Sequence, residues 1–180
     1  LAKNPGSLVN LLAQFKQRQI QKRYRCLVHG KFKVESASIK APIARSSTNR
    51  HQFQVDISGR PATTYYKVVK TFEKLDFSQL ESKKLDQHRS SYQQGFSLVL
   101  CFPKTGRTHQ IRVHLSHLHH PLVADKLYGG SSRSKLDQIW CPRQFLHADW
   151  IKIRHPRTKD KVSFKAPLAK DLSEALSLLQ

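Results

Sequence analysis

The chain has 180 residues and a mass of 20.8 kDa, a size that suits a single domain. Lysine and arginine number 32 against 12 acidic residues, which gives a formal net charge of +20 at pH 7. This balance excludes an acidic-tail protein, argues against an enzyme of neutral small molecules, and predicts a polyanionic partner. Hydrophobic residues make up 38% of the chain, which is enough for a core. The chain contains no run of about 18 apolar residues, so the sequence predicts no membrane-spanning helix.

The cysteines and the N-terminal residues indicate a cellular compartment. Cys26, Cys101 and Cys141 are odd in number and far apart, which favours a reduced intracellular protein over a disulfide scaffold. The first residues lack the charged-then-apolar layout of a secretory signal. We therefore expect a cytoplasmic protein. Methionine is absent, so either the initiator has been removed or the chain begins within a longer protein.

The first half of the chain predicts a helix followed by strands. Ser7 is a candidate cap for a helix with a single buried stripe, formed by Leu8, Leu11, Leu12 and Phe15. Residues 24–28 alternate in polarity and predict a strand that Gly30 closes. Residues 31–60 are polar and basic, and predict short strands separated by loops. Residues 62–72 are rich in threonine, tyrosine and valine and predict a further strand.

The second half predicts the clearest strand, a helix and a late hairpin. A polar excursion is expected over 75–94 and a strand over 96–102. Thr108 is a candidate cap for a helix over 109–119, whose apolar spacing is set by Ile111, Leu115, Leu118 and Leu122. Residues 150–154 and 162–164 resemble a hairpin.

Asp171 and Glu174 form a capping-box pattern before a last helix, whose apolar positions are Leu172, Ala175, Leu176 and Leu179. The order of elements over the whole chain predicts an α+β fold with a mixed, largely antiparallel sheet and flanking helices, built as one domain over 1–180.

Five histidines crowd into a short stretch of the sequence: His109, His114, His117, His119 and His120. A metal site needs matched ligand spacing, but neither H-E-x-x-H nor C-x-x-C occurs. We therefore expect no metal, and interpret the cluster as a basic, partly protonated surface that faces phosphate. The chain also lacks the G-x-S-x-G pattern of a nucleophilic serine, and residues 129–132 do not continue as a phosphate-binding loop.

The segment K-T-G-R-T-H-Q-I-R-V-H-L, residues 104–115, carries the strongest chemical signal. It places Arg107 just before the expected helix and Arg112 about one turn inside it. Both guanidinium groups can therefore point to the same end of the sheet, where free helix N–H groups also favour an anion. Arginine binds carboxylate or phosphate through paired donors. The alternative is an amphipathic helix whose arginines are simply solvated.

The stretch T-G-R-T-H-Q-I-R-V-H-L, followed by H-P-L-V-A-D-K-L-Y-G over 120–129, resembles the signature of the RluA-type RNA pseudouridine synthases. Further stretches agree with this family in the same order along the chain: residues 21–30, 59–66, 145–148, 155–156 and 164–167. The resemblance implies the fold of a pseudouridine synthase catalytic domain, incomplete at its N-terminus. It also implies an isomerase that acts on uridines in RNA, with large-subunit ribosomal RNA as the expected partner and with no cofactor.

The resemblance assigns roles to six residues of this chain. Tyr24 is expected to stack on the target uracil and to assist proton transfer, and Arg112 to pair with the catalytic aspartate and keep it ionised. Ile111 is expected to wall the base pocket. Arg107, His109 and Gln110 are expected to support that wall and to bind nearby phosphates. The target base must leave its stack to enter such a pocket.

The family's catalytic aspartate lies in an H-R-L-D motif, upstream of a strand ending much like residues 1–4 of this chain. We therefore expect that aspartate to precede Leu1. Leu-Asp pairs at 75–76, 85–86 and 136–137 do not fit the motif. Asp125 is interpreted as structural, holding the turn over 126–129, and Ala124 stands where the family more often has glycine. These residues alone are therefore expected to bind RNA without isomerising uridine.

Two alternatives remain from the sequence. The first is a noncatalytic RNA-binding protein derived from a synthase, and the second, weaker one is metal-dependent RNA processing by the histidine cluster. The reading frame upstream of Leu1 distinguishes the first alternative from a synthase, because the gene of an active synthase should encode H-R-L-D there. The sequence does not determine the oligomeric state, and a monomer is the default expectation.

Overall fold

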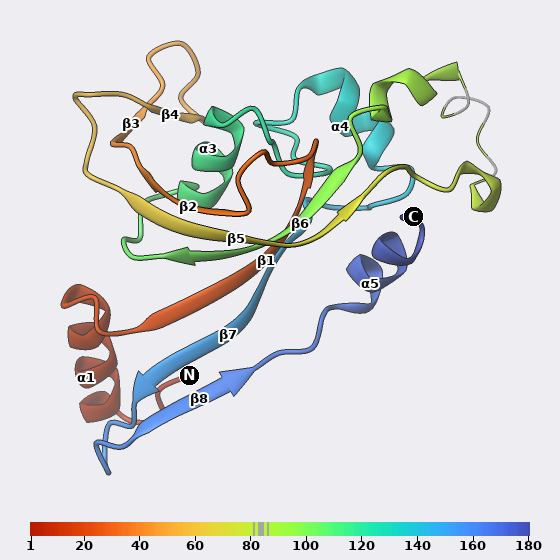
Figure 1. Ribbon diagram of the computed structural model, residues 1–180. Coiled ribbons are helices and arrows are strands. Elements are labelled where there is room, and N and C mark those ends of the chain that lie inside the picture. The colour runs from red at the N-terminus through yellow and green to blue at the C-terminus, as the bar shows by residue number, and fades with distance from the viewer. Residues whose placement is uncertain (81, 83–84, 86) are drawn as a thin grey trace.

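The computed structural model describes residues 1–80, 82, 85 and 87–180 (Figure 1). Its helices are α1 (Pro5–Lys16), α3 (Gln110–His117), α4 (Ser131–Asp137) and α5 (Lys170–Ser177), with short 3-10 turns η1 (Phe77–Gln79) and η2 (Arg89–Tyr92). Its strands are β1 (Gln21–His29), β2 (Ser36–Lys40), β3 (Ile43–Arg45), β4 (Phe53–Val55), β5 (Thr63–Phe72), β6 (Phe96–Pro103), β7 (Leu146–Arg154) and β8 (Lys161–Lys165).

Six strands form one sheet in the order β2-β5-β6-β1-β7-β8, and every neighbouring pair is antiparallel. Strands β3 and β4 form a separate antiparallel hairpin, which α3 contacts. In Figure 1, α1 lies at one end of β1 and β7, whereas α5 lies at the opposite end of the molecule. The expected α+β class with a largely antiparallel sheet is confirmed.

The two faces of the central strands carry two separate parts of the core. Because strand side chains alternate, Leu27 joins the cluster with α4 and α5, while Cys26 and Val28 join the cluster beneath α3. Burying one such leucine or valine side chain contributes about 1.5–3 kcal/mol. The structure confirms, with slightly different bounds, the strands expected over 24–28, 62–72 and 96–102 and the late hairpin.

The first helix differs from its prediction in both its cap and its buried face. Asn4, not Ser7, caps α1, because its side-chain oxygen accepts from the backbone N–H of Ser7 at 2.8 Å. Only Gln14 is buried on α1, and its amide group holds the backbone of Arg154. The apolar stripe is largely exposed, with Leu8 at 51%, Leu12 at 58% and Phe15 at 50%. The helix stands at the end of the sheet, so its apolar spacing does not face a core.

Other elements also depart from sequence expectation. His109, not Thr108, occupies the N-cap position of α3, and Ala169 precedes α5, because the Asp171 carboxylate binds Arg143 instead of capping. The buried face of α5 is as predicted. The segment 75–94 is not simply solvated, since Leu75, Leu85 and Tyr92 are buried in the core. Residues 81, 83, 84 and 86 of that prediction lie outside the described residues.

Helix α4 was not predicted, because its sequence has no apolar periodicity. Within the part of the chain that the structure describes, no helix is both long and apolar enough to cross a membrane.

Candidate functional site

A cavity of about 340 Å³ opens where β1, the turn after β6 and the start of α3 meet. We call it the central cavity. All six residues singled out from the sequence line it, namely Tyr24, Arg107, His109, Gln110, Ile111 and Arg112. They come from β1 and from the segment 107–112, so the fold brings together residues that are about eighty positions apart. Six further residues line the cavity and were given no role from the sequence: Lys22, Pro103, Thr105, Gly106, Gln144 and Leu146.

Tyr24 is fixed by contacts on both faces of β1. On its own face it packs against the cluster that contains Cys26. On the opposite face, the buried Asp149 binds Arg23 at 2.9 and 3.0 Å and Arg25 at 3.3 Å. Asp149 sits where the pairing of β1 and β7 shifts register, a bulge of the kind that often re-aims a side chain.

Burial raises the pKa of Tyr24, and the nearby Cys26 adds to this rise. The phenol therefore remains protonated at neutral pH. Cys26 is itself a buried free thiol whose pKa is raised, mainly by burial. The cavity thus presents a neutral aromatic ring with a hydroxyl group that can donate or accept a proton.

Arg112 is held by Asp125 in a buried ion pair. Its Nε and Nη2 donate to the two carboxylate oxygens at 2.8 and 2.7 Å, and its guanidinium carbon lies 4.8 Å from the centre of the Tyr128 ring. Among the described residues, its third nitrogen, Nη1, has no hydrogen-bond partner and is not sealed from solvent. Because Arg112 lines the central cavity, Nη1 is available to an anion there.

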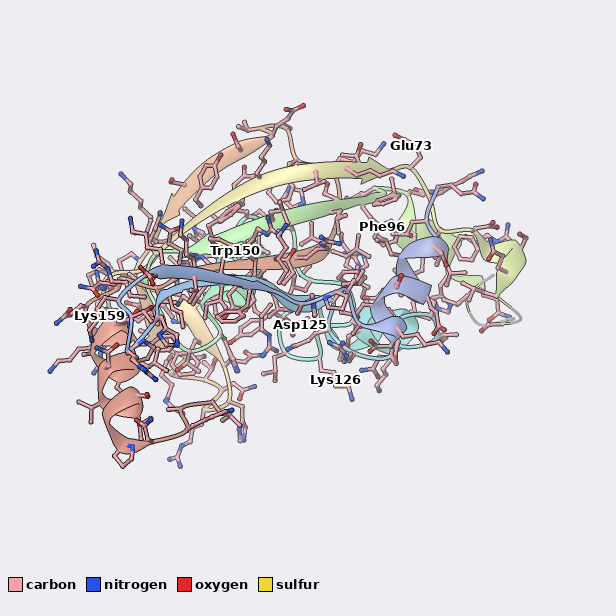
Figure 2. The ribbon with its side chains drawn as sticks, turned by 90° about the horizontal axis from the view of Figure 1, so that it is seen from below. Glu73, Phe96, Asp125, Lys126, Trp150 and Lys159 are labelled. Atoms are coloured by element: carbon pink, nitrogen blue, oxygen red, sulfur yellow. The ribbon has the colours of Figure 1, made fainter. Side chains whose placement is uncertain are left out.

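Asp125 also organises its own turn. One of its carboxylate oxygens accepts from the backbone N–H groups of Leu127 and Tyr128 at 3.0 and 3.1 Å, so the predicted structural role is confirmed. In Figure 2, Lys126 points outward while Asp125 lies inside the molecule. Ala124, just before the turn, has φ 58, a left-handed conformation that favours glycine.

Replacing Gly129 by alanine is expected to lower the free energy of unfolding by about 1–3 kcal/mol. A Cβ at this position meets the backbone oxygen of Asp125 at 2.7 Å, so the turn that orients Asp125 has to open. Urea denaturation measures the loss. The matched control is Gly6→Ala in α1, where the added Cβ has only the Asn4 side chain nearby, at 3.7 Å. It should be neutral or raise stability by up to about 1 kcal/mol. Equal effects of the two substitutions would contradict the assigned clash.

Gln110 supports the cavity wall from behind. Its amide nitrogen donates to the Thr63 carbonyl and the Thr64 hydroxyl, both at 3.0 Å. Its carbonyl oxygen accepts from the Thr105 hydroxyl at 2.7 Å and from the Arg107 N–H at 3.0 Å. These bonds fix the turn before α3 to β5. Because they occupy both ends of the amide, Gln110 acts as a support for Arg107, and the expected direct contact of Gln110 with phosphate gains no support.

The histidines do not form one basic surface. His109 shares a hydrogen bond of 2.9 Å with the Tyr128 hydroxyl, and burial, followed by the charge of Arg112, lowers its pKa. His114 is fully buried between the Thr64 hydroxyl and the Ala41 carbonyl, and burial lowers its pKa as well. The expectation of a partly protonated surface is wrong for these two, because a neutral ring suits their environments better.

Another histidine of this stretch, His120, stacks on Phe32 with ring centres 3.9 Å apart. Across the described ranges of the chain, no group of three or more histidine, cysteine, aspartate or glutamate side chains is arranged to hold a metal ion.

The charge in the central cavity is entirely positive. Lys22, Arg107 and Arg112 line it, and burial lowers the pKa of Lys22, whereas no aspartate or glutamate is among the lining residues. Two of the Leu-Asp pairs lie elsewhere, because Asp76 caps η1 and Asp137 is buried against His29 and Tyr92. Asp86 lies outside the described residues. The cavity is therefore suited to an anionic ligand with an apolar or aromatic part.

The sequence is similar to those of RNA pseudouridine synthases. A family model described as RNA pseudouridylate synthase matches residues 1–117. An uncharacterized RNA pseudouridine synthase of Chlorobaculum parvum is 36% identical over 197 residues, covering 100% of this chain and 53% of that protein. A ribosomal large subunit pseudouridine synthase D of Blochmanniella floridana is 32% identical over 190 residues, with the same two coverages. The chain spans about half the length of the curated relatives it matches.

Solved structures agree with the sequence comparison. Human RNA pseudouridylate synthase domain containing 1 superposes with a TM-score of 0.74 at 27% identity, covering 97% of this chain and 66% of that one. The human domain containing 4 superposes with a TM-score of 0.69 at 18% identity, covering 98% and 69%, and shows the fold alone. The expected catalytic-domain fold is therefore confirmed.

Proposed function

We propose, from the premise that this chain belongs to the RNA pseudouridylate synthase family, that its central cavity receives a uridine of RNA and is where that uridine becomes pseudouridine. One observation supports the proposal more than any other. Tyr24 on β1 and Arg112 on α3, distant in sequence, line the same cavity. Arg112 is held there by the buried Asp125, and the residues on either side of Tyr24, Arg23 and Arg25, are held by the buried Asp149. The names of two relatives, the ribosomal large subunit synthases D and C, support ribosomal RNA as the substrate.

The reaction breaks the N1–C1′ bond, turns the detached uracil and forms a C5–C1′ bond, while C5 loses its proton and N1 gains one, so that the product is an isomer of the substrate. Tyr24 offers a ring on which the extruded base can stack and a protonated hydroxyl for proton transfer. Arg112 offers Nη1 to the attacking carboxylate, and an adjacent cation keeps a carboxylate ionised. Ile111 and the neutral His109 form the wall beside the base. Arg107 faces the RNA phosphates, and Gln110 holds Arg107 in place.

The attacking carboxylate is proposed to come from an H-R-L-D motif preceding Leu1, because none of the residues lining the central cavity is acidic. On this proposal, residues 1–180 are the larger part of one catalytic domain. Neither a cofactor nor a metal is needed for the reaction as written, and we propose the cytoplasm as the site of action.

The test compares the 180-residue chain with the full-length protein on ribosomal RNA, with pseudouridine mapped in the product. We expect the full-length protein to form pseudouridine, and the shorter chain to bind the RNA without product. Product from the shorter chain would show that the carboxylate has been assigned wrongly. RNA binding without product from the full-length protein would favour a noncatalytic RNA-binding protein instead.

A further inference from the structure

Two more cavities adjoin the central cavity at the turn formed by Gly106 and Arg107. The first, about 380 Å³ in volume, lies between α1 and this turn, and we call it the α1 cavity. The second, about 300 Å³, lies between the β3–β4 hairpin and the same turn, and we call it the hairpin cavity. Figure 1 shows α1 and the hairpin on opposite sides of the ends of β5 and β6. Gly106 and Arg107 line all three cavities.

Both side cavities are positively charged. The α1 cavity is lined by five cationic residues, Lys16, Arg18, Lys22, Lys104 and Arg107, and by no acidic residue. The hairpin cavity is lined by three arginines, Arg45, Arg60 and Arg107, again with no acidic residue. In the described part of the chain, none of these seven side chains forms an ion pair, although other cations such as Arg23, Arg112 and Arg143 do. The unpaired charges indicate an anionic occupant.

Each side cavity also contains an aromatic ring beside its cations. Phe15 lines the α1 cavity and is 50% exposed, although it is a large apolar residue. Phe53 lines the hairpin cavity, with the guanidinium carbon of Arg45 at 5.1 Å from the ring centre. Rings on which bases stack, next to cations that follow the backbone, are the usual composition of a site for single-stranded nucleic acid. A ligand that offered only phosphate groups would not need the aromatic rings of Phe15 and Phe53.

Arg107 is well placed to connect the three cavities. Its backbone N–H is fixed by the buried Gln110, and its Nε donates to the Pro61 carbonyl at 3.3 Å. These bonds hold the side chain at the shared rim, while its two Nη atoms make no hydrogen bond with other described residues. One guanidinium group can therefore contact a phosphate on either side of a base that enters the central cavity.

We propose that one RNA strand crosses all three cavities, with the target uridine in the central cavity and its two flanking nucleotides in the α1 cavity and the hairpin cavity. This inference rests on the proposed function for the central position and adds the path of the strand on both sides. Phe15 and Phe53 stack on bases of the flanking nucleotides, and the cations around them bind the phosphates. The strand therefore lies across the turn at Gly106 and Arg107, from α1 to the β3–β4 hairpin.

The test measures binding of the full-length protein to a single-stranded RNA of about nine nucleotides whose only uridine is central. The α1-cavity variant is Lys16→Gln with Arg18→Gln, and the hairpin-cavity variant is Arg45→Gln with Arg60→Gln. The control with equal loss of charge is Lys74→Gln with Lys170→Gln. Both side chains are exposed, Lys74 follows the end of β5, Lys170 begins α5, and neither lines any of the three cavities. All proteins are first checked for an unchanged melting temperature.

Each cavity variant should bind about tenfold more weakly than the wild type near physiological salt. It should also reduce the slope of log K against log salt by about 1.4, since each lost contact to a single strand removes about 0.7. The control variant should change RNA affinity and the slope of its salt dependence very little. Phe15→Ala should weaken binding by about fivefold or more through lost stacking. Equal losses in the control and the cavity variants would overturn the proposal.

Truncated RNAs test the direction of the strand. In the first truncated RNA the uridine is the 5′-terminal nucleotide, and in the second it is the 3′-terminal nucleotide. One cavity variant should match the wild type on the first truncated RNA, and the other variant on the second. If both variants lose affinity equally on both truncated RNAs, no such path exists. Pseudouridine formation is measured separately on ribosomal RNA, so failure of the proposed function is visible independently of the binding pattern.

Discussion

Replacing Arg112 by alanine is expected to lower pseudouridine formation by the full-length protein at least about 100-fold, a loss typical of removing one preorganised donor in an active site. The same change should destabilise the fold by about 3–5 kcal/mol, because it leaves the Asp125 carboxylate buried without its partner. RNA affinity should change far less, since many other cations remain available to bind phosphate. Turnover at saturating RNA, urea denaturation and equilibrium binding measure the three quantities.

A double variant separates the structural effect from the catalytic one. In Arg112→Gln with Asp125→Asn, neither buried charge remains, and the asparagine oxygen can still accept from the N–H groups of Leu127 and Tyr128. Most of the lost stability should return, because no unpaired charge is buried. Turnover should stay low, since no cation faces the attacking carboxylate. If turnover returned together with stability, the role of Arg112 would be only structural.

The strands of this protein could be predicted because their sequences alternate or are rich in β-branched and aromatic residues. Burial alternates at the start of β5, whereas the end of β1 and most of β6 are buried on both faces of the sheet. Helix α1 shows the limit of the same reasoning. Its apolar residues also recur at helical spacing, although less regularly than those of α5, and α1 stands at the end of the sheet while α5 packs on the core. Periodicity shows that a helix has an apolar face, whereas only the tertiary arrangement decides whether that face meets other residues.

The candidate site was predicted from the resemblance of ordered motifs to a known family, and the fold brings the named residues to one cavity. What the pattern could not show was the supporting contacts. The carboxylate that holds Arg112 is Asp125, thirteen positions away, and the bonds of Gln110 reach β5, about forty-six positions away. The aromatic rings of the side cavities were not predicted as binding groups, because Phe15 was assigned to a buried stripe and Phe53 fell in a region of expected short strands and loops. Long-range contacts leave no periodic signal in the sequence.

Two substitutions of Tyr24 should separate base stacking from proton transfer. Tyr24→Phe keeps the ring, so RNA affinity and KM should be nearly unchanged, while kcat should fall about 10²- to 10⁴-fold if the hydroxyl transfers a proton. Tyr24→Ala also removes the stacking surface, which is worth about 1–3 kcal/mol per base, so binding should weaken in addition. Tyr65→Phe on β5 is the control, because Tyr65 does not line the central cavity. Its kinetics should match the wild type.

The pH profile gives an independent measurement of the same hydroxyl. Burial raises the pKa of Tyr24 above its usual value of about 10, so the wild-type phenol keeps its proton through neutral pH. Any loss of kcat caused by ionisation of Tyr24 should therefore begin only above about pH 10, and this loss should be absent in Tyr24→Phe. A Tyr24→Phe enzyme with wild-type kcat would restrict Tyr24 to stacking. A Tyr24→Ala enzyme with wild-type KM and kcat would remove Tyr24 from the site altogether, because the ring that is to hold the extruded base would then be dispensable.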